Sequence, residues 1–345
     1  MGPSLSFPAH LQAWATLLRL GPTARGILPF LLGATIAWSQ GNPLNWSVLI
    51  ISSLAVFCIM EMTFLVNEYY DYQADLLNKT FHRLSGGSRM LPSGLISRDS
   101  TLKAAYAFIA IAAILGLILY FCYHTGPYTL PFGILAMFIG YFYTAKPFQW
   151  SYHGVGEIAI WFTCGWLANM SGYYLQTGHL DLMTTLVSLP GATSVFLVIL
   201  VNEIPDIPSD SLAGKRNLAV RLGKGKSFWL YNILLVLCYV NIVSIIFLGV
   251  PKLSGLLSLI LLPIIIRSIM TTMKNLEGKT LESLSLKTML FDHLITIIYA
   301  VTFVVVGWSS NPVNDMIIVG ILFLLCFSLE GLSFISANKL KEYIK

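Results

Sequence analysis

Charged residues are scarce in this 345-residue chain: Asp, Glu, Lys and Arg make up 11% of it, whereas hydrophobic residues make up 56%. The mean hydropathy of +0.74 excludes a soluble globular protein. The five cysteines stand singly in apolar runs with no CxxC pattern, which excludes a cysteine-ligated metal site. No cleavable signal peptide is evident, so we expect the first apolar run to remain as a membrane helix. The composition predicts a polytopic membrane protein.

Ten apolar runs are predicted to cross the bilayer, which takes about 20 residues per helix. They are residues 25–40, 47–69, 101–123, 127–145, 156–175, 183–204, 227–249, 252–273, 288–308 and 313–336. A short amphipathic stretch at residues 11–18 is predicted to lie at the membrane interface. The predicted fold is an all-α transmembrane bundle, a single membrane domain over residues 1–345.

The basic residues predict the orientation of this bundle. With a cytoplasmic N-terminus, all 21 Lys and Arg residues except Lys252 and Arg267 fall on the cytoplasmic side. This asymmetry follows the positive-inside rule and predicts a cell-membrane protein with both termini in the cytoplasm. Because topology accounts for the net charge of +5, we expect the lipid bilayer and no nucleic acid as a partner.

Two acidic segments repeat each other: VNEYYDYQAD at residues 66–75 and VNEIPDIPSD at residues 201–210. Each presents Asn, then Asp four residues on, then Asp four further, a spacing that places the three side chains on one helix face. Carboxylate and amide oxygens suit Mg²⁺, which also binds substrate phosphates. The predicted metal ligands are Asn67, Asp71, Asp75, Asn202, Asp206 and Asp210, of which the four aspartates are the predicted catalytic residues. The alternative is a pair of solvated acidic helix ends.

A basic loop follows each acidic segment, at residues 78–100 and 211–226. Cations opposite the acidic segments would neutralise a bound diphosphate from the other side. The predicted diphosphate-binding residues are Arg83, Arg89, Lys146, Lys215 and Arg216. For each of these residues alone, membrane topology is an alternative explanation.

Several other polar and aromatic residues lie within or beside the predicted spans. Glu68, Tyr72, Tyr143 and Glu203 are candidates to line a cavity, although packing also explains an aromatic residue. Intramembrane ionisable residues usually face an interior, and here they are Glu61, Glu157, Arg267, Asp292 and His293. For Glu61 and Glu157 the alternative is a structural pairing with a loop cation, and Asp292 with His293 either helps to deprotonate an acceptor or forms a satisfied helix-end pair.

Taken together, these segments resemble the UbiA-type intramembrane prenyltransferases over roughly residues 15–308. The resemblance rests on NEYYDYQAD with the following GGSR and PSGLIS, on YTAKPFQWSYHGVGE, and on NEIPDIPSDSLAGKRNLAVRLG. It is strongest to the 1,4-dihydroxy-2-naphthoate polyprenyltransferase branch of menaquinone biosynthesis. It implies a helical bundle around a central cavity with a cytoplasmic cap, dependence on Mg²⁺, a polyprenyl diphosphate donor and a small aromatic acceptor.

The chain departs from this family in two places. Residues 309–345 are predicted to add a tenth helix and a tail to the family's nine helices, and Glu68 stands where the family commonly has Asp. A transporter would place its carboxylates at the membrane midplane, whereas these lie at cytoplasmic helix ends. A terpene cyclase on the same fold, which needs no external acceptor, remains open as the alternative to a transferase, and the sequence does not give the prenyl chain length.

Overall fold

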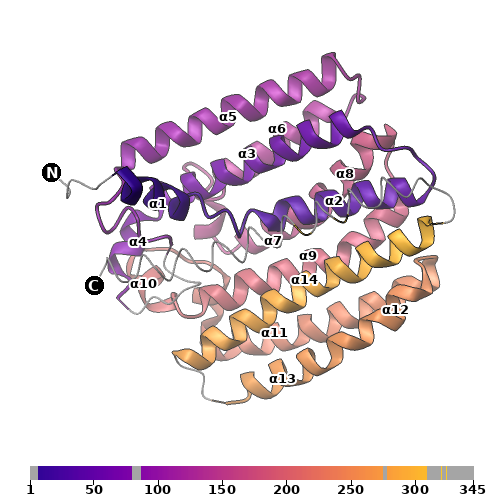
Figure 1. Ribbon diagram of the computed structural model, residues 1–345. Helices are drawn as coiled ribbons and strands as arrows, with labels where there is room; N and C mark the ends of the chain where they lie inside the picture. Colours follow the sequence, from indigo (N-terminus) through magenta and orange to yellow (C-terminus); the bar gives the residue numbers. More distant parts are fainter. Residues whose placement is uncertain (1–6, 80–86, 275–277, 309–319, 321–323, 325–345) are drawn as a thin grey trace.

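Every regular element in the described part of the chain is a helix. The computed structural model describes residues 7–79, 87–274 and 278–308, together with Gly320 and Leu324. The predicted all-α bundle is confirmed, with its helices running side by side (Figure 1). The predicted tenth span at 313–336 and the predicted ligand Arg83 lie outside the described residues.

Within the described residues, the first nine predicted spans correspond to nine helical rods. They are α2 (Ala24–Ser39), α3 (Trp46–Tyr70), α5 (Arg98–Phe121), α6 (Thr129–Phe142), the rod of α7 (Gly156–Ile160), η2 (Trp161–Leu167) and α8 (Ala168–Thr177), α9 (Leu182–Glu203), α11 (Leu218–Ser244) with η3 (Ile245–Leu248), the rod of α12 (Lys252–Ser258), η4 (Leu259–Leu261) and α13 (Leu262–Thr272), and α14 (Lys279–Gly307). Among the helices described, six rods are long and apolar enough to cross a membrane, and α2 and α6 are shorter apolar helices.

Four rods begin at a polar side chain that caps the helix. Asn45, Ser97, Asp181 and Asn217 each accept a hydrogen bond from the backbone N–H three residues on, at 2.7 to 3.1 Å. Such caps satisfy N–H groups that the first helical turn leaves open. At the other end of α8, Gly178 adopts φ 79°, a left-handed conformation that stops the helix.

Helix α2 lies in the middle of the bundle and packs against α8 at backbone distance. A Cβ at Gly33 would lie 1.9 Å from the carbonyl oxygen of Asn169, and one at Gly172 would lie 1.8 Å from that of Phe30. Only glycine fits at either position, so these two residues allow the close approach of α2 and α8, as small residues do in membrane bundles.

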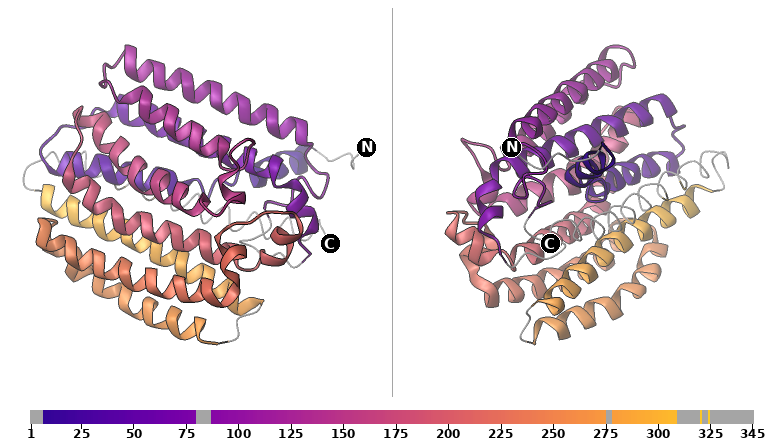
Figure 2. Two further views of the ribbon diagram at one scale, coloured as in Figure 1. Left: turned by 180° about the vertical axis from the view of Figure 1, so that it is seen from behind. Right: turned by 60° about the vertical axis from the view of Figure 1, so that its left-hand side comes forward.

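The other rods lie on two sides of this central pair. Helices α3, α5 and α6 pack together on one side, and α9, α11, α12, α13 and α14 form the other (Figures 1 and 2). Large apolar side chains are exposed on the outer surface, among them Phe121 at 62% and Trp229 at 68%. Such a surface suits lipid rather than water.

Three short helices lie at the same end of the bundle: α1 (Phe7–Leu17), α4 (Tyr72–Leu77) and α10 (Ile207–Leu212) (Figure 1). Helix α4 follows α3 and α10 follows α9, and the two short helices pack against each other. This packing brings both acidic segments together at one end of the bundle, which we call the polar cap.

Candidate active site

The first acidic segment runs through a junction between two helices. Helix α3 ends at Tyr70 and α4 begins at Tyr72, so Asp71 joins them. The Asp71 N–H donates to the Asn67 carbonyl at 2.8 Å, and the Asp75 N–H to the Asp71 carbonyl at 2.9 Å. The four-residue spacing therefore persists across the junction, and the Asn67 amide donates to the Asp71 carboxylate at 2.8 Å.

The second acidic segment is broken more strongly, because Pro205 has no N–H to continue the helix. Helix α9 ends at Glu203, and the Asp206 N–H donates to the Glu203 carbonyl at 3.1 Å, which closes a tighter turn. The Asp210 N–H then donates to the Asp206 carbonyl at 2.8 Å. The Oδ1 of Asn202 is buried there without a hydrogen-bond partner.

Lys215 joins the two acidic segments. Its Nζ lies 3.0 Å from Asp71 Oδ2 and 3.9 Å from Asp210 Oδ2, and 5.6 Å from the centre of the Tyr152 ring. Burial disfavours the ammonium form, but the carboxylates of Asp71 and Asp210 outweigh it and hold the pKa of Lys215 well above its ordinary value. A fixed cation therefore lies between two of the predicted catalytic aspartates.

Three further side chains hold the aspartates in place. Asn78 donates to Asp206 Oδ1 at 2.7 Å, and Asn217 donates to Asp210 Oδ2 at 2.8 Å. The Tyr152 hydroxyl donates to Asp71 Oδ1 at 2.8 Å. Sequence reasoning missed all three, although Tyr152 lies in the YTAKPFQWSYHGVGE segment and Asn217 in the second basic loop.

The first basic loop closes over Asp75. A Cβ at Gly87, which adopts φ 69°, would lie 2.3 Å from Asp75 Oδ2, so the loop backbone approaches the carboxylate as only glycine permits. The Arg89 guanidinium donates to the Asp75 carbonyl.

Burial, together with the charges of Glu68 and Asp71, raises the pKa of Asp75 to about 8, and burial is also the main cause that raises the pKa of Asp210 to about 6. Burial without a bound metal ion therefore disfavours the ionised form of both carboxylates.

Glu68 anchors the cap and is fully engaged with protein groups. Its two oxygens accept hydrogen bonds from the N–H and the hydroxyl of Ser88, each at 2.7 Å, and its Oε1 lies 2.7 Å from an Arg19 nitrogen. The carboxylate is buried. It therefore ties the segment before α2 and the first basic loop to α3.

We expect Glu68→Ala to lower the free energy of unfolding by about 3 kcal/mol, because removal of one member of a buried ion pair leaves the other members unsatisfied. Thermal unfolding of the detergent-solubilised variant measures the effect, with Asp99→Ala at an exposed position of α5 as the matched control. Equal melting temperatures for the two variants would contradict an anchoring role.

The other predicted residues lie at varying distances from this cluster. Tyr72 lies beside Arg98, whose Cζ is 4.9 Å from the ring centre. The carboxyl groups of Glu203 and Glu157 act electrostatically on the Tyr143 hydroxyl, so these three residues lie near one another. Lys146 and Arg216 are exposed, and the Arg216 N–H donates to the Tyr152 carbonyl at 3.0 Å.

Two buried glutamates accept hydrogen bonds from neutral groups, whereas the alternative interpretation predicted a loop cation as the partner of each. Glu61 accepts a hydrogen bond from the Thr23 hydroxyl at 2.6 Å, and Glu157 accepts one from the Leu218 N–H at 2.9 Å. Arg267 is exposed on α13. Asp292 and His293 line an internal cavity rather than the polar cap.

The chemistry of the cap fits a divalent cation such as Mg²⁺. In the described residues, no three acidic, His or Cys side chains form a group that could hold a metal ion. Lys215 and three amides contact the carboxylates of the cap. The available donors are nonetheless carboxylate and amide oxygens, the ligands that Mg²⁺ prefers. The unpartnered Oδ1 of Asn202 is a further oxygen of this kind.

The described residues thus form a helical bundle with six rods long and apolar enough to cross a membrane, and acidic and basic side chains meet at one end of it. Residues 27–291 match the UbiA prenyltransferase family, and the chain belongs to this family. It is therefore a membrane prenyltransferase and a multi-pass membrane protein.

Named relatives and solved structures agree with this assignment. The chain is 27% identical over 224 residues to 1,4-dihydroxy-2-naphthoate octaprenyltransferase of Bacillus subtilis (strain 168). The matched region covers 64% of this chain and 70% of that protein. It is 26% identical over 241 residues to human UbiA prenyltransferase domain-containing protein 1, covering 69% of each.

Among solved structures, digeranylgeranylglyceryl phosphate synthase shares the fold with a TM-score of 0.62 and 18% identity, covering 86% of this chain and 99% of that one. A UbiA homologue from Archaeoglobus fulgidus, bound to GPP and Mg²⁺, has a TM-score of 0.52 and 18% identity, covering 83% of this chain and 99% of that one.

Proposed function

We propose that this prenyltransferase moves an isoprenyl group from a polyprenyl diphosphate to 1,4-dihydroxy-2-naphthoate, with Mg²⁺ as its metal, in menaquinone biosynthesis. The observation that carries the proposal is Lys215 between Asp71 and Asp210, because it joins both acidic segments and a basic loop in one site. The named bacterial relatives support the choice of acceptor.

The metal ligands in this proposal are the oxygens of the two acidic segments. They are Asn67, Asp71, Asp75, Asn202, Asp206 and Asp210, with the four aspartates as the catalytic set. Bound Mg²⁺ would neutralise the diphosphate and so favour its departure.

The cations of the cap bind the diphosphate from the other side. Lys215 supplies a fixed ammonium group, while Arg89, Arg216, Lys146 and the loop residue Arg83 supply further positive charge. As the bond between the allylic carbon and the diphosphate oxygen breaks, its electron pair leaves with the diphosphate. Cations held beside that oxygen would stabilise the growing charge without reorganising.

The interior of the bundle keeps water away from the allylic cation that results. Its core is apolar: Leu197, Leu200 and Val201 on α9 are fully buried just before the second acidic segment. In such surroundings an electron-rich ring carbon is the available nucleophile, and the face of the Tyr143 ring, near Glu203, would stabilise the cation.

Purified protein with Mg²⁺ and a set of prenyl diphosphates tests the acceptor. We expect 1,4-dihydroxy-2-naphthoate to give a product of acceptor plus prenyl mass less CO₂, because the acceptor carboxylate is lost when the ring is prenylated. Mass spectrometry with ¹⁴C-carboxyl-labelled acceptor measures both events. Transfer to 4-hydroxybenzoate but not to the naphthoate would contradict this acceptor.

The domain boundaries and the orientation are also proposals. We infer a prenyltransferase core at residues 15–308, an additional helix and tail at 309–345, and both termini in the cytoplasm of a cell-membrane protein. Reporter fusions at Lys345 and within residues 309–312 are expected to report opposite sides of the membrane. If both report the same side, residues 313–336 do not cross it.

A further inference from the structure

Two cationic residues lie where α13 packs against α14, toward the end of the bundle that carries α4 and α10 (Figure 1). Arg267 is on α13, five residues before that helix ends at Thr272, and Lys287 is on α14, eight residues after it begins. Both residues lie inside rods that are long and apolar enough to cross a membrane. Ionisable groups within such rods are costly and usually serve a function.

The Lys287 side chain reaches across the contact between the two helices. Its Nζ donates to the Thr271 hydroxyl oxygen at 3.1 Å, and that hydroxyl donates to the Arg267 carbonyl at 2.5 Å. The ammonium group therefore lies at the backbone of Arg267, and its remaining N–H groups are available to a further acceptor. Arg267 is exposed and Lys287 is half-buried. We call Arg267, Thr271 and Lys287 the basic cluster.

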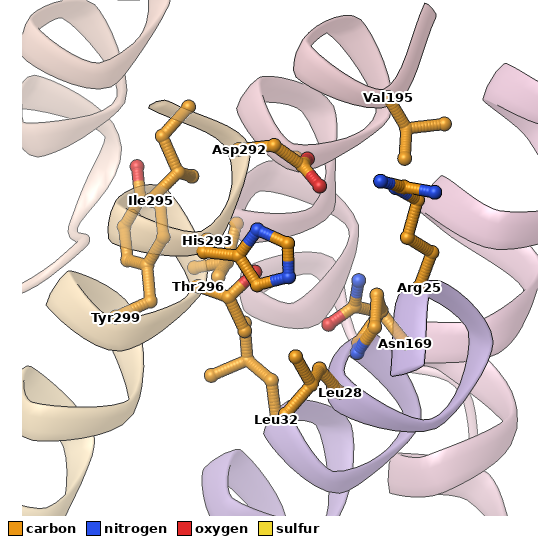
Figure 3. Close-up of a pocket in the computed structure, with 13 residues that line it drawn as sticks. Arg25, Leu28, Leu32, Asn169, Val195, Asp292, His293, Ile295, Thr296 and Tyr299 are labelled. Carbon is orange, nitrogen blue, oxygen red and sulfur yellow. The ribbon is translucent and has the colours of Figure 1, made fainter. Parts of the chain in front are cut away.

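The described residues supply no counter-ion to the basic cluster. In the described part of the chain, neither cation forms an ion pair with a carboxylate. Helices α11, α12 and α13 contain no acidic residue, and α14 contains Glu282 and Asp292. Glu282 lies five residues before Lys287 and so on another side of α14. Asp292 faces the internal cavity between α2, α8, α9 and α14 and accepts a hydrogen bond from Ser194 (Figure 3).

The surface around the basic cluster suits a lipid at the level of its headgroup. Ile266 and Met270, on either side of the arginine on α13, are 55% and 57% exposed, so this face suits acyl chains. Trp229 on α11 is also exposed, and Asn232, one turn further along, accepts a hydrogen bond from Thr272 at 3.0 Å. Tryptophan is enriched where acyl chains meet headgroups. Apolar contacts for chains and two cations for a phosphate thus occur together.

We propose that the basic cluster binds the phosphate of an anionic phospholipid, whose acyl chains lie against the exposed apolar surface of α13. The phosphate accepts hydrogen bonds from the Arg267 guanidinium and the Lys287 ammonium group, both of which bind phosphate oxygens well. Basic sites between membrane helices bind anionic headgroups in this way. Membrane topology alone does not account for the cluster, because the positive-inside rule concerns loop charges and these residues lie within helical rods.

Native mass spectrometry of the detergent-solubilised protein measures lipid binding directly. Phosphatidylglycerol is the anionic probe, and phosphatidylcholine with the same acyl chains is the probe without net charge. We expect phosphatidylglycerol to bind the wild-type protein at least about fivefold more tightly. Arg267→Gln and Lys287→Gln are each expected to weaken that binding about fivefold, since one basic residue near the membrane surface contributes about this factor. Binding of phosphatidylcholine should not change.

Two further variants are controls for charge and position. Lys252 is exposed at the opposite end of the α12–α13 rod, so Lys252→Gln should leave phosphatidylglycerol binding unchanged. Arg267→Lys keeps the positive charge and should retain most of the binding. If Lys252→Gln weakens binding as much as Arg267→Gln does, the effect is one of net charge and the basic cluster is not the site.

Two other results would overturn the inference. Equal binding of the two lipids to the wild-type protein would show that no headgroup charge is recognised, and this comparison decides even if a variant fails to fold. Displacement of phosphatidylglycerol by millimolar inorganic phosphate would assign the cluster to a free anion instead of a lipid. No prenyl transfer is measured, so the outcome is independent of the proposed function.

Discussion

Asp71→Ala and Asp206→Ala are each expected to lower kcat at least about 100-fold at saturating Mg²⁺, because each removes a carboxylate from the group that stabilises the departing diphosphate. The two residues belong to different acidic segments that meet at the polar cap, so both losses should be similar in size. A continuous assay of diphosphate release measures them.

The matched control for these variants is Asp99→Ala, which removes an exposed carboxylate from the first turn of α5. It should keep wild-type turnover. Near wild-type turnover of Asp71→Ala or Asp206→Ala, with the folded state confirmed by circular dichroism, would show that these aspartates are not the catalytic set.

Lys215→Met is expected to raise the KM for prenyl diphosphate about tenfold or more, because it removes a charge-assisted contact to the phosphate oxygens. It also removes the cation between Asp71 and Asp210, so in Mg²⁺-free buffer the two carboxylates repel and the melting temperature falls. Added Mg²⁺ should restore more of the lost melting temperature in this variant than in the wild type.

Lys215→Arg and Lys224→Met complete this experiment. The first keeps the positive charge and should retain much of the donor affinity, whereas the second removes an exposed lysine of the same basic loop and should change neither quantity. A Lys215→Met protein with an unchanged KM and an unchanged melting temperature would remove Lys215 from the site.

The helical rods were largely predictable from the sequence because apolar runs of about 20 residues indicate membrane helices. Six of the described rods are long and apolar enough to cross a membrane, whereas α2 and α6 are shorter. The meeting of the two acidic segments was also predictable, since both follow helices that run in the same direction. Their local geometry was only partly so. Pro205 predicts the break after α9, but VNEYYDYQAD contains no proline or glycine that would predict the end of α3 at Tyr70.

Side-chain partners across long stretches of sequence were not predictable. Lys215 was expected to bind a diphosphate, but its position between Asp71 and Asp210 depends on how α4, α10 and the second basic loop pack. Glu68 was expected near a cavity, whereas the structure pairs it with Arg19 and Ser88. Such pairings arise from tertiary packing, which hydropathy and residue spacing do not encode.

The dependence of diphosphate release on an aromatic acceptor tests the central claim most directly, because it separates a transferase from a terpene cyclase on the same fold. Purified protein with Mg²⁺ and prenyl diphosphate is assayed with and without 1,4-dihydroxy-2-naphthoate, and products are identified by mass spectrometry. The proposed transferase releases diphosphate only when the acceptor is present and yields the prenylated naphthalene. Diphosphate release without acceptor, with a cyclic terpene as the main product, would contradict it.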